Sequence, residues 1–327
     1  MHNDSLKIVL SYSLAIALFV SITTFSLAYG STGFRSLDSI LNLEDTISRL
    51  RFTRTMFAIL TGISLAIAGS LIQIATRNPL ASPSILGLPS GALTSLLIAI
   101  IISGYIPRGL SMLFAFIGAL IAYSITSSIA SIAGLSAASL VLAGIAVSSF
   151  FSGISHMLLY IAHSKIRGHP LLVLLGSVSL ARFHELPLYT SAIIPIIATV
   201  FMLWKQINAL LFGDEFALQL GYNPKITRLL LASIASLLTA ITVSFVGIVS
   251  FVGLIAPHIA RLMVGDDVRK HLPLSMVSGG IIVLASDIFV RYISSSFSFL
   301  GELPLSIPIG IVGALVLSYL VASRLRD

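Results

Sequence analysis

The feature that most constrains this sequence is a series of long apolar segments without charged residues. Residues 8–34, 55–76 and 78–107 contain no Asp, Glu, Lys or Arg. In a lipid bilayer the backbone must satisfy its own hydrogen bonds, so each segment is expected to form a helix of about 20 residues. Hydrophobic residues make up 57% of the 327-residue chain and charged residues only 9%, whereas a soluble domain has about a quarter of its residues charged. The sequence therefore predicts an integral membrane protein.

The remaining apolar segments complete the predicted set of spans. Residues 109–164 are too long for one helix, and the small residues at 134–138 predict a break between two spans. Residues 229–260 contain Gly247, Gly253 and Pro257, which leaves open one long helix or two helices joined within the membrane. Further spans are expected at 186–204, 271–290 and 303–323. The sequence thus predicts an all-α, polytopic fold of nine or ten spans.

The N-terminal segment and the loop charges address orientation. A cleaved signal peptide is an alternative for residues 8–29, but their apolar stretch exceeds the 7–15 residues usual for such signals, so an uncleaved first span is favoured. With ten spans and an internal N-terminus, ten Lys and Arg residues would lie inside and nine outside. This balance gives no positive-inside signal. Either the topology is inverted or the outer face keeps basic residues for a partner that is acidic.

Several function classes are poorly supported. The chain has no cysteine, no G-x-x-x-x-G-K-[ST] phosphate-binding loop, no H-E-x-x-H and no G-x-S-x-G. Its seven histidines are not at metal-ligand spacing. The net charge of +7 comes from basic residues that flank membrane spans, so nucleic-acid binding is not expected. An enzyme, a metal site and a bound cofactor are therefore not predicted for this chain.

Three segments have a more specific pattern. Residues 49–92 read RLRFTRTMFAILTGISLAIAGSLIQIATRNPLASPSILGLPSGA, residues 246–273 read VGIVSFVGLIAPHIARLMVGDDVRKHLP, and residues 286–304 read SDIFVRYISSSFSFLGELP. In this order they resemble the FecCD family of permeases, the membrane subunits of ABC importers for iron–siderophore complexes, haem and cobalamin. The similarity extends from about Arg49 to the C-terminus.

The resemblance implies an architecture and a set of partners. The fold would be the type II ABC importer permease fold with ten helices, a weak inverted repeat and both termini in the cytoplasm, in the inner (cytoplasmic) cell membrane. A second copy of the chain, two ATP-binding cassette subunits and an extracytoplasmic substrate-binding protein would be its partners, with ATP and Mg²⁺ bound only by the ATPase. The single domain 1–327 would divide into a first span 8–29, an external loop 30–53, spans two to six in 54–204, a cytoplasmic coupling loop 205–225, and spans seven to ten in 226–327.

Three arginines match those that dock the binding protein in the family. The resemblance places Arg51, Arg54 and Arg291 on the outer side, where their guanidinium groups would meet carboxylates of the binding protein. The alternative is that Arg51 and Arg54 only anchor a helix end at the lipid headgroups. Arg291 also has Asp287 one helical turn away, so an internal ion pair is open to it.

The loop LLFGDEFALQLGYNP at residues 210–224 matches the ATPase-contacting loop of the family. Small residues recur every four positions and would form one stripe on a helix, with acidic residues near the helix start. A plain amphipathic surface helix is the alternative. The predicted coupling residues are Gly213, Asp214, Glu215, Ala217, Leu220 and Gly221.

The break between the fourth and fifth spans resembles the cytoplasmic gate of the family. It comprises Ser136, Ala137, Ala138 and Ser139, whose small side chains suit a constriction that opens and closes. An ordinary tight turn between helices is the alternative. Asn78, within Asn78-Pro79-Leu80-Ala81, is interpreted as structural because its side chain can cap backbone groups beside the prolines.

The function most strongly predicted is an importer permease driven by a separate ATPase. A gradient-driven secondary transporter is the alternative, and it would use Asp287 and Glu302 as titratable groups. Iron–siderophore is the first candidate substrate, followed by cobalamin, and then haem or an oxyanion such as molybdate. The residues themselves do not separate these substrates.

Overall fold

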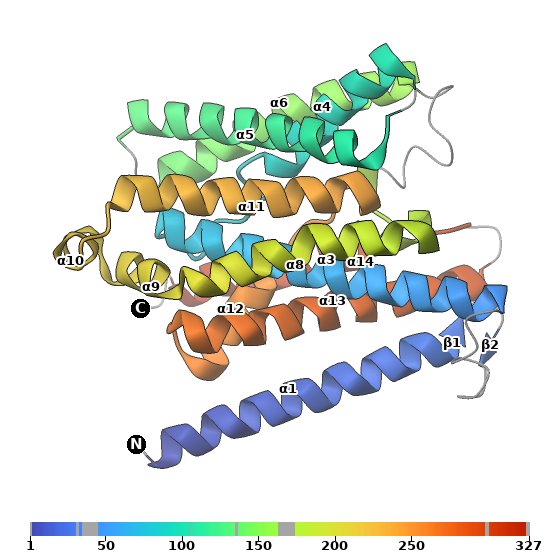
Figure 1. Cartoon of the computed structure of the whole chain (residues 1–327), viewed down its shortest axis with the longest axis horizontal. Coiled ribbons are helices and arrows are strands. Elements are labelled where there is room, and N and C mark those ends of the chain that lie inside the picture. Colours follow the sequence, from blue (N-terminus) through green and yellow to red (C-terminus); the bar gives the residue numbers. More distant parts are fainter. Residues whose placement is uncertain are drawn as a thin grey trace.

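The computed structural model describes residues 2–30, 33–34, 45–104, 106–134, 137–162, 174–297 and 301–324 (Figure 1). The helices are α1 (His2–Ala28), α3 (Thr46–Thr76), α4 (Leu88–Ser103), α5 (Arg108–Ile132), α6 (Ala137–Ala162), α8 (Leu186–Met202), α9 (Trp204–Phe212), α10 (Asp214–Gln219), α11 (Pro224–Val246), α12 (Val252–Val264), α13 (Val268–Ser296) and α14 (Ser306–Arg324). Short 3₁₀ turns lie at Val178–Leu180 and Phe183–Glu185. The strands β1 (Tyr29–Gly30) and β2 (Gly33–Phe34) pair antiparallel, with Tyr29 opposite Phe34.

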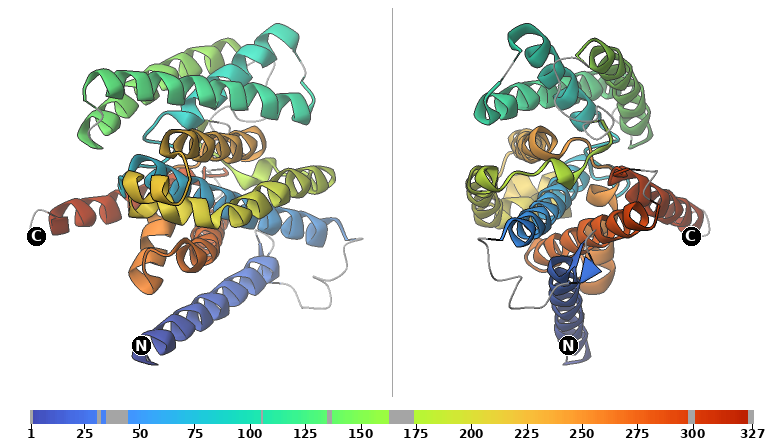
Figure 2. Two further views of the ribbon diagram at one scale, coloured as in Figure 1. Left: turned by 60° about the vertical axis from the view of Figure 1, so that its left-hand side comes forward. Right: turned by 90° about the vertical axis from the view of Figure 1, so that its right-hand side faces the viewer.

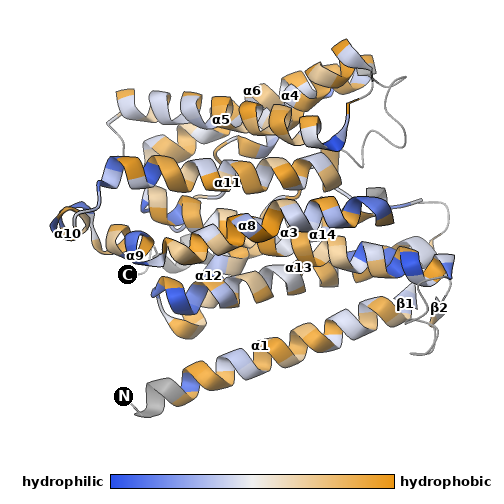
Figure 3. Cartoon of the chain, viewed as in Figure 1, coloured by the Kyte–Doolittle hydropathy of each residue, from blue (hydrophilic) through white to orange (hydrophobic). Residues whose placement is uncertain are grey.

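The expected spans are present as helices. Seven helices of the described residues are long and apolar enough to cross a membrane, and α4, α12 and the 306–318 part of α14 are shorter apolar helices. Together they account for about ten spans and confirm the all-α fold predicted from sequence. Figure 3 shows hydrophilic residues gathered toward the two ends of the helices, as expected where a bilayer surrounds the middle.

The run at 229–260 divides into two helices. α11 ends at Val246, α12 begins at Val252, and the connection between them contains Gly247 at a φ of 86° and Phe251 at a φ of 64°. These left-handed positions end one helix and redirect the chain. The predicted break in 109–164 is also confirmed, because α5 ends at Ile132 and α6 begins at Ala137.

Two expected loops contain more helix than their sequence suggested. The predicted external loop 30–53 ends early because α3 begins at Thr46, where the Asp45 side chain accepts a hydrogen bond from the Ser48 amide at 3.1 Å. This N-terminal cap extends α3 well beyond its apolar segment. The predicted coupling loop 205–225 contains most of α9 and all of α10, and α11 already begins at Pro224.

Helix α3 is the central element of the bundle. It packs against α8, α11, α12 and α13, whereas α1 contacts mainly α13 and lies at the edge (Figure 1). In the apolar 18-residue segment of α3, 78% of the residues are buried, against 6% in the corresponding segment of α1. The helices α4, α5 and α6 pack together on the side of α11 away from α13, and α14 projects from the bundle (Figure 2).

Close backbone contacts join α3 to its neighbours. A Cβ added at Gly62 would lie 2.2 Å from the Gly279 carbonyl oxygen of α13, and one added at Gly69 would lie 1.8 Å from the Gly253 carbonyl oxygen of α12. Only glycine allows helices to approach this closely. The contacts fix the position of α3 against α12 and α13.

Candidate functional site

Two charged clusters lie at opposite ends of α3. The Arg54 cluster comprises Arg51, Arg54, Asp287, Arg291 and Glu302 at the start of α3 and the end of α13. The Asp214 cluster comprises Arg77, Asp214 and Arg228 at the end of α3 and the start of α11. Because α3 begins where α13 ends and ends where α11 begins, it runs antiparallel to both. The predicted inverted repeat requires α3 and α11 to run in opposite directions, as they do here. A structural similarity between the N-terminal and C-terminal halves of the chain stays a prediction.

Asp287 is the centre of the Arg54 cluster. Its side chain is fully buried and accepts from Arg54 Nε at 2.8 Å and from Arg291 Nε at 2.8 Å. Arg54 Nη1 also lies 2.6 Å from the Glu302 carboxylate. Arg291 donates further to the Ser26 hydroxyl at 2.7 Å and the Ser26 carbonyl at 2.8 Å. The cluster therefore connects α1, α3, α13 and the segment before α14.

Arg51 is held by backbone carbonyls at the same end. Its side chain is buried, and it donates to the Ala28 carbonyl and to the Gly33 carbonyl, the latter at 2.8 Å. This fixes the end of α1 and the strand pair against α3. The arrangement agrees with a structural role for Arg51.

The three predicted docking residues thus differ in exposure. Arg51 is 6% exposed and Arg291 5%, whereas the Arg54 side chain is 20% exposed. The structure contains the internal Asp287–Arg291 pair that the one-turn spacing left open. Docking of a binding protein by these arginines stays a prediction, and Arg54 is the member best placed for it.

Other basic residues at this end were not singled out from the sequence. Arg108 Nε pairs with Glu185 at 2.9 Å, and its Nη1 donates to the Ser244 carbonyl at 2.6 Å. Arg49 lies 5.8 Å above the Phe183 ring. Such partners are far apart in the chain, so no local motif reveals them.

The Asp214 cluster joins α10 to two spanning helices. Arg228 binds both carboxylate oxygens of Asp214, at 2.7 and 3.0 Å, and Arg77 reaches one of them at 2.5 Å. Arg228 Nε also donates to the Ala75 carbonyl at 3.1 Å. Arg77 has a left-handed φ of 50°, which ends α3. A displacement of α10 would therefore act on α3 and α11 together.

The predicted small-residue stripe in the coupling loop is not continuous. α10 has only six residues, and Gly213 and Gly221 lie outside it at φ values of 132° and 81°. Ala217 is fully buried because α10 packs on α9 and α11, so it faces inward. Glu215 is exposed. The exposed apolar side chains of this segment are instead Phe216 and Leu218 in α10 and Leu220 directly after it.

The predicted gate lies at the start of α6. Ser136 is outside the described residues, and Ala137 is the first residue of α6. Ala138 is exposed and Ser139 is half-buried. A position in the first turn of α6 agrees equally with a gate and with a tight turn before the helix, and the gating role stays a prediction.

Two polar interactions stabilise the connections near the Asp214 cluster. The Asn78 side chain accepts from the Leu80 amide at 3.0 Å, which agrees with its structural interpretation. Asp267 caps α13 and accepts from Asn208 of α9 at 2.9 Å. Although burial opposes ionisation, hydrogen bonds from Asn208 and Arg269 lower the pKa of Asp267 from 3.8 to about 2.

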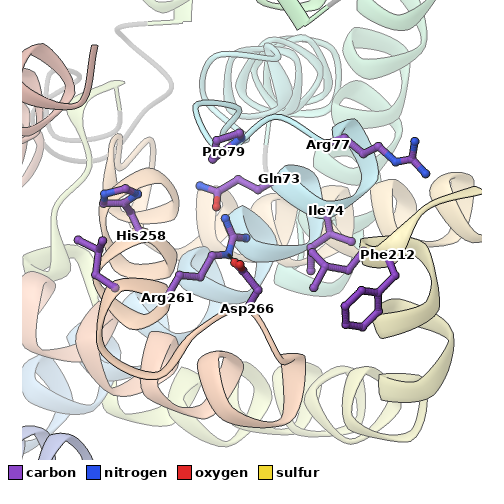
Figure 4. Close-up of a pocket in the computed structure, with 10 residues that line it drawn as sticks. Gln73, Ile74, Arg77, Pro79, Phe212, His258, Arg261 and Asp266 are labelled. Carbon is purple, nitrogen blue, oxygen red and sulfur yellow. Dashed lines mark ion pairs between the residues drawn. The ribbon is translucent and has the colours of Figure 1, made fainter. Parts of the chain in front are cut away.

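A pocket opens between the ends of α3, α9 and α12. Its volume is about 590 Å³, and its polar lining comprises Gln73, Arg77, His258, Arg261 and Asp266. Figure 4 shows Gln73 and Arg261 directed toward one another across the pocket, while Arg77 points away from it. Among the described residues, no group of three or more His, Cys, Asp or Glu side chains is arranged to hold a metal ion.

Apolar helices of spanning length with charged clusters at both ends are typical of a polytopic membrane protein. The FecCD transport family matches residues 9–323, and this chain belongs to that family. The Fe(3+) dicitrate transport system permease protein FecC of Escherichia coli is 34% identical over 86% of this chain and 84% of its own length. The cobalamin import system permease protein BtuC of Halobacterium salinarum is 34% identical over 85% of this chain and 73% of its own.

A solved structure shows the same fold. An inward-facing metal-chelate type ABC transporter superposes with a TM-score of 0.78 at 25% identity, covering 96% of this chain and 99% of its own. The chain is therefore an ABC transporter permease subunit, a membrane transport component rather than an enzyme. This confirms the family resemblance read from the three sequence segments.

Proposed function

We propose that this chain is the permease of an ATP-driven importer and forms a homodimeric, gated pore for a metal chelate, with an iron(III)–siderophore complex as the first candidate. The observation that carries the proposal is the family match over residues 9–323. Relatives named for ferric citrate and for cobalamin are about equally similar. Cobalamin, haem and molybdate therefore remain alternative cargoes.

In this proposal the transporter lies in the cytoplasmic membrane of the cell. Helix α10 and both termini of the chain lie on the cytoplasmic side. Two ATP-binding subunits, which hold ATP and Mg²⁺, would then bind the α10 face with its exposed Phe216, Leu218 and Leu220. Their movement on ATP binding would reach α3 and α11 through Asp214, and from there the gate at the start of α6. Coupling of this kind requires an element with two discrete positions, and α10 is the candidate.

The Arg54 cluster would face outward and receive the substrate-binding protein. Arg54 keeps a fifth of its side chain exposed, so a carboxylate of the binding protein can approach it beside Glu302. Rim charges of this type raise the encounter rate more than the final affinity. Arg51 and Arg291 would support this surface from within.

A second copy of the chain would complete the pore. The projection of α14 (Figure 2) leaves Ile311, Val312 and Leu315 exposed on one helix. Lipid or a second copy would cover these side chains in the membrane. The family resemblance implies a permease–permease interface, and we propose part of this surface for it.

A gradient-driven secondary transporter is less well supported. It would use Asp287 and Glu302 to carry protons, but both carboxylates pair with arginines. Ion pairs that join α3, α13 and the segment before α14 are explained by a structural role in holding these elements together.

The test is to purify the tagged chain gently from its native membrane and assay the same fractions for ATP hydrolysis. Co-purification of a stoichiometric ATP-binding subunit is expected, followed by uptake of radiolabelled iron chelate in liposomes only with ATP and binding protein. Arg54→Glu should weaken capture of the binding protein in a salt-dependent way. Uptake by an ATPase-free oligomer under an ion gradient would contradict the proposal.

A further inference from the structure

We propose that the pocket between α3, α9 and α12 binds the phosphate headgroup of an anionic phospholipid, with the acyl chains along the outside of α9 and α12. The pocket holds cationic donors, an unpaired acceptor and an apolar rim within one volume of about 590 Å³. The site adjoins the Asp214 cluster, because Arg77 belongs both to that cluster and to the pocket lining. It does not depend on which solute is transported.

Arg261 is the anion-binding group. Its side chain is 14% exposed, and its Nε and Nη2 atoms are buried with no hydrogen-bond partner among the described residues. The nearest carboxylate oxygen, from Asp266, is 3.7 Å from Nε, which is too far for a hydrogen bond. Asp266 itself is 72% exposed to solvent. A buried guanidinium without close acceptors is costly, and a phosphate oxygen would satisfy it.

Gln73 supplies the complementary acceptor on the opposite wall. The residue is 2% exposed, and its Oε1 atom has no partner in the described part of the chain. Its Nε2 atom is engaged by long contacts to the carbonyls of Gly253 at 3.4 Å and Leu254 at 3.5 Å. Neither Gln73 Oε1 nor the Arg261 donors that it faces have a partner among the described residues, so a ligand lying between the two side chains should offer a hydroxyl group to Gln73 and a phosphate oxygen to Arg261. A phosphodiester with a glycerol headgroup has both.

The charges around the pocket leave one positive charge in excess. Arg77 and Arg228 share the single carboxylate of Asp214. Arg261 has only the distant carboxylate of Asp266. The Asp214 cluster therefore carries one positive charge in excess next to the pocket, and this charge would attract an anionic ligand toward Arg261.

Aromatic and basic side chains place this end of the bundle at the depth of lipid headgroups. Trp204, at the start of α9, lies under the Arg269 guanidinium at 4.6 Å and near the Lys205 ammonium at 5.6 Å. Tyr12 of α1 donates its hydroxyl to the carbonyl of Lys270. Tryptophan and tyrosine accompanied by basic residues are typical of the membrane–water interface, and basic pockets there bind anionic headgroups.

The pocket rim is apolar and exposed. Phe212 of α9 and Leu262 of α12 both line the pocket and are 71% and 75% exposed. These side chains offer a path for acyl chains that continue from a bound headgroup. An acidic side chain of a protein partner would satisfy Arg261 but would leave this path unused, so the lipid is favoured.

The experiment is native mass spectrometry of the full-length, delipidated chain after addition of phosphatidylglycerol, phosphatidylmethanol or phosphatidylcholine. Phosphatidylglycerol is expected to bind at one site per chain, more tightly than either of the others. Arg261→Gln should lower its affinity about tenfold or more, since a charge-assisted hydrogen bond is lost. The matched control Arg269→Gln removes an equal charge at the same end, outside the pocket, and should leave the affinity unchanged.

A second variant keeps the test informative if Arg261→Gln does not fold. Gln73→Leu should retain binding of the anionic lipids but abolish the preference for phosphatidylglycerol over phosphatidylmethanol, which lacks the glycerol hydroxyls. Equal losses in Arg261→Gln and Arg269→Gln, or equal binding of phosphatidylcholine, would overturn the proposal. So would displacement of the lipid by inorganic phosphate at similar concentration, which would mark the pocket as a site for the free ion. If no lipid binds and Arg261→Gln instead releases an ATP-binding subunit, the pocket accepts a protein side chain and the proposal is wrong.

Discussion

Replacing Asp287 by asparagine tests whether the buried carboxylate stabilises the bundle by neutralising two arginines. The carboxylate has no exposed surface and accepts from both Arg54 and Arg291. Asp287→Asn keeps the shape but leaves the Arg291 guanidinium buried without a counter-charge. Removing one partner of a buried pair costs about 3–5 kcal/mol. Because the amide oxygen still accepts one hydrogen bond, and Glu302 still pairs with Arg54, a loss of about 3 kcal/mol is expected.

The matched control is Asp214→Asn. Asp214 also lies between two arginines, but its side chain is 40% exposed, so solvent screens the lost charge. Its replacement should cost less than about 1 kcal/mol. Thermal unfolding of both variants in the same detergent should show a fall of about 5 °C or more for Asp287→Asn and little change for Asp214→Asn. Equal falls in the two variants would refute the reasoning from burial, and Asp287→Asn with Arg291→Met should recover part of the loss.

Three further predictions concern packing, coupling and pH. Gly69→Ala should cost about 1–3 kcal/mol because its Cβ meets the Gly253 carbonyl, whereas Gly153→Ala, in open space on α6, should not destabilise the chain in thermal unfolding. Leu218→Asp, on the exposed face of α10, should leave the chain folded by gel filtration but abolish co-purification of the ATP-binding subunit. Folding lowers the pKa of Asp267 from 3.8 in the unfolded chain to about 2. Its contribution to stability is therefore full well above pH 3.8 and is lost as the pH falls from 3.8 toward 2. The difference in stability between the wild type and Asp267→Asn should therefore shrink over this range in chemical unfolding, and a constant difference would contradict the assignment.

The apolar segments predicted the helices well because a bilayer leaves little choice of backbone structure. The break before Ala137 and the family were recognisable from residues close together in the chain. The start of α3 was missed since its first two turns depend on a cap at Asp45 rather than on hydropathy. The division of 229–260 into α11 and α12 was left open, because glycine and proline inside a membrane helix are compatible with both outcomes.

The charged residues were harder to interpret, since their partners are distant in sequence. Arg54 and Arg291 were identified as important, but the spacing of residues could not show that both converge on Asp287. Arg77 was not linked to Asp214, although the two lie at the ends of elements that meet in space. Gln73 and Arg261 were visible only as isolated polar residues, and their facing positions follow from the packing of α3 on α12.

The glycine contacts of α3 fix the number of residues between its two contact points. Gly62 and Gly69 are two helical turns apart and touch α13 and α12, while Arg54 and Arg77 join clusters on opposite sides of them. A single inserted residue between the glycines would rotate everything after it by about 100° and shift it by about 1.5 Å. The second glycine would leave its contact, and Arg77 would turn away from its carboxylate. Among related sequences, insertions and deletions should therefore avoid this stretch and collect in the connections at either end.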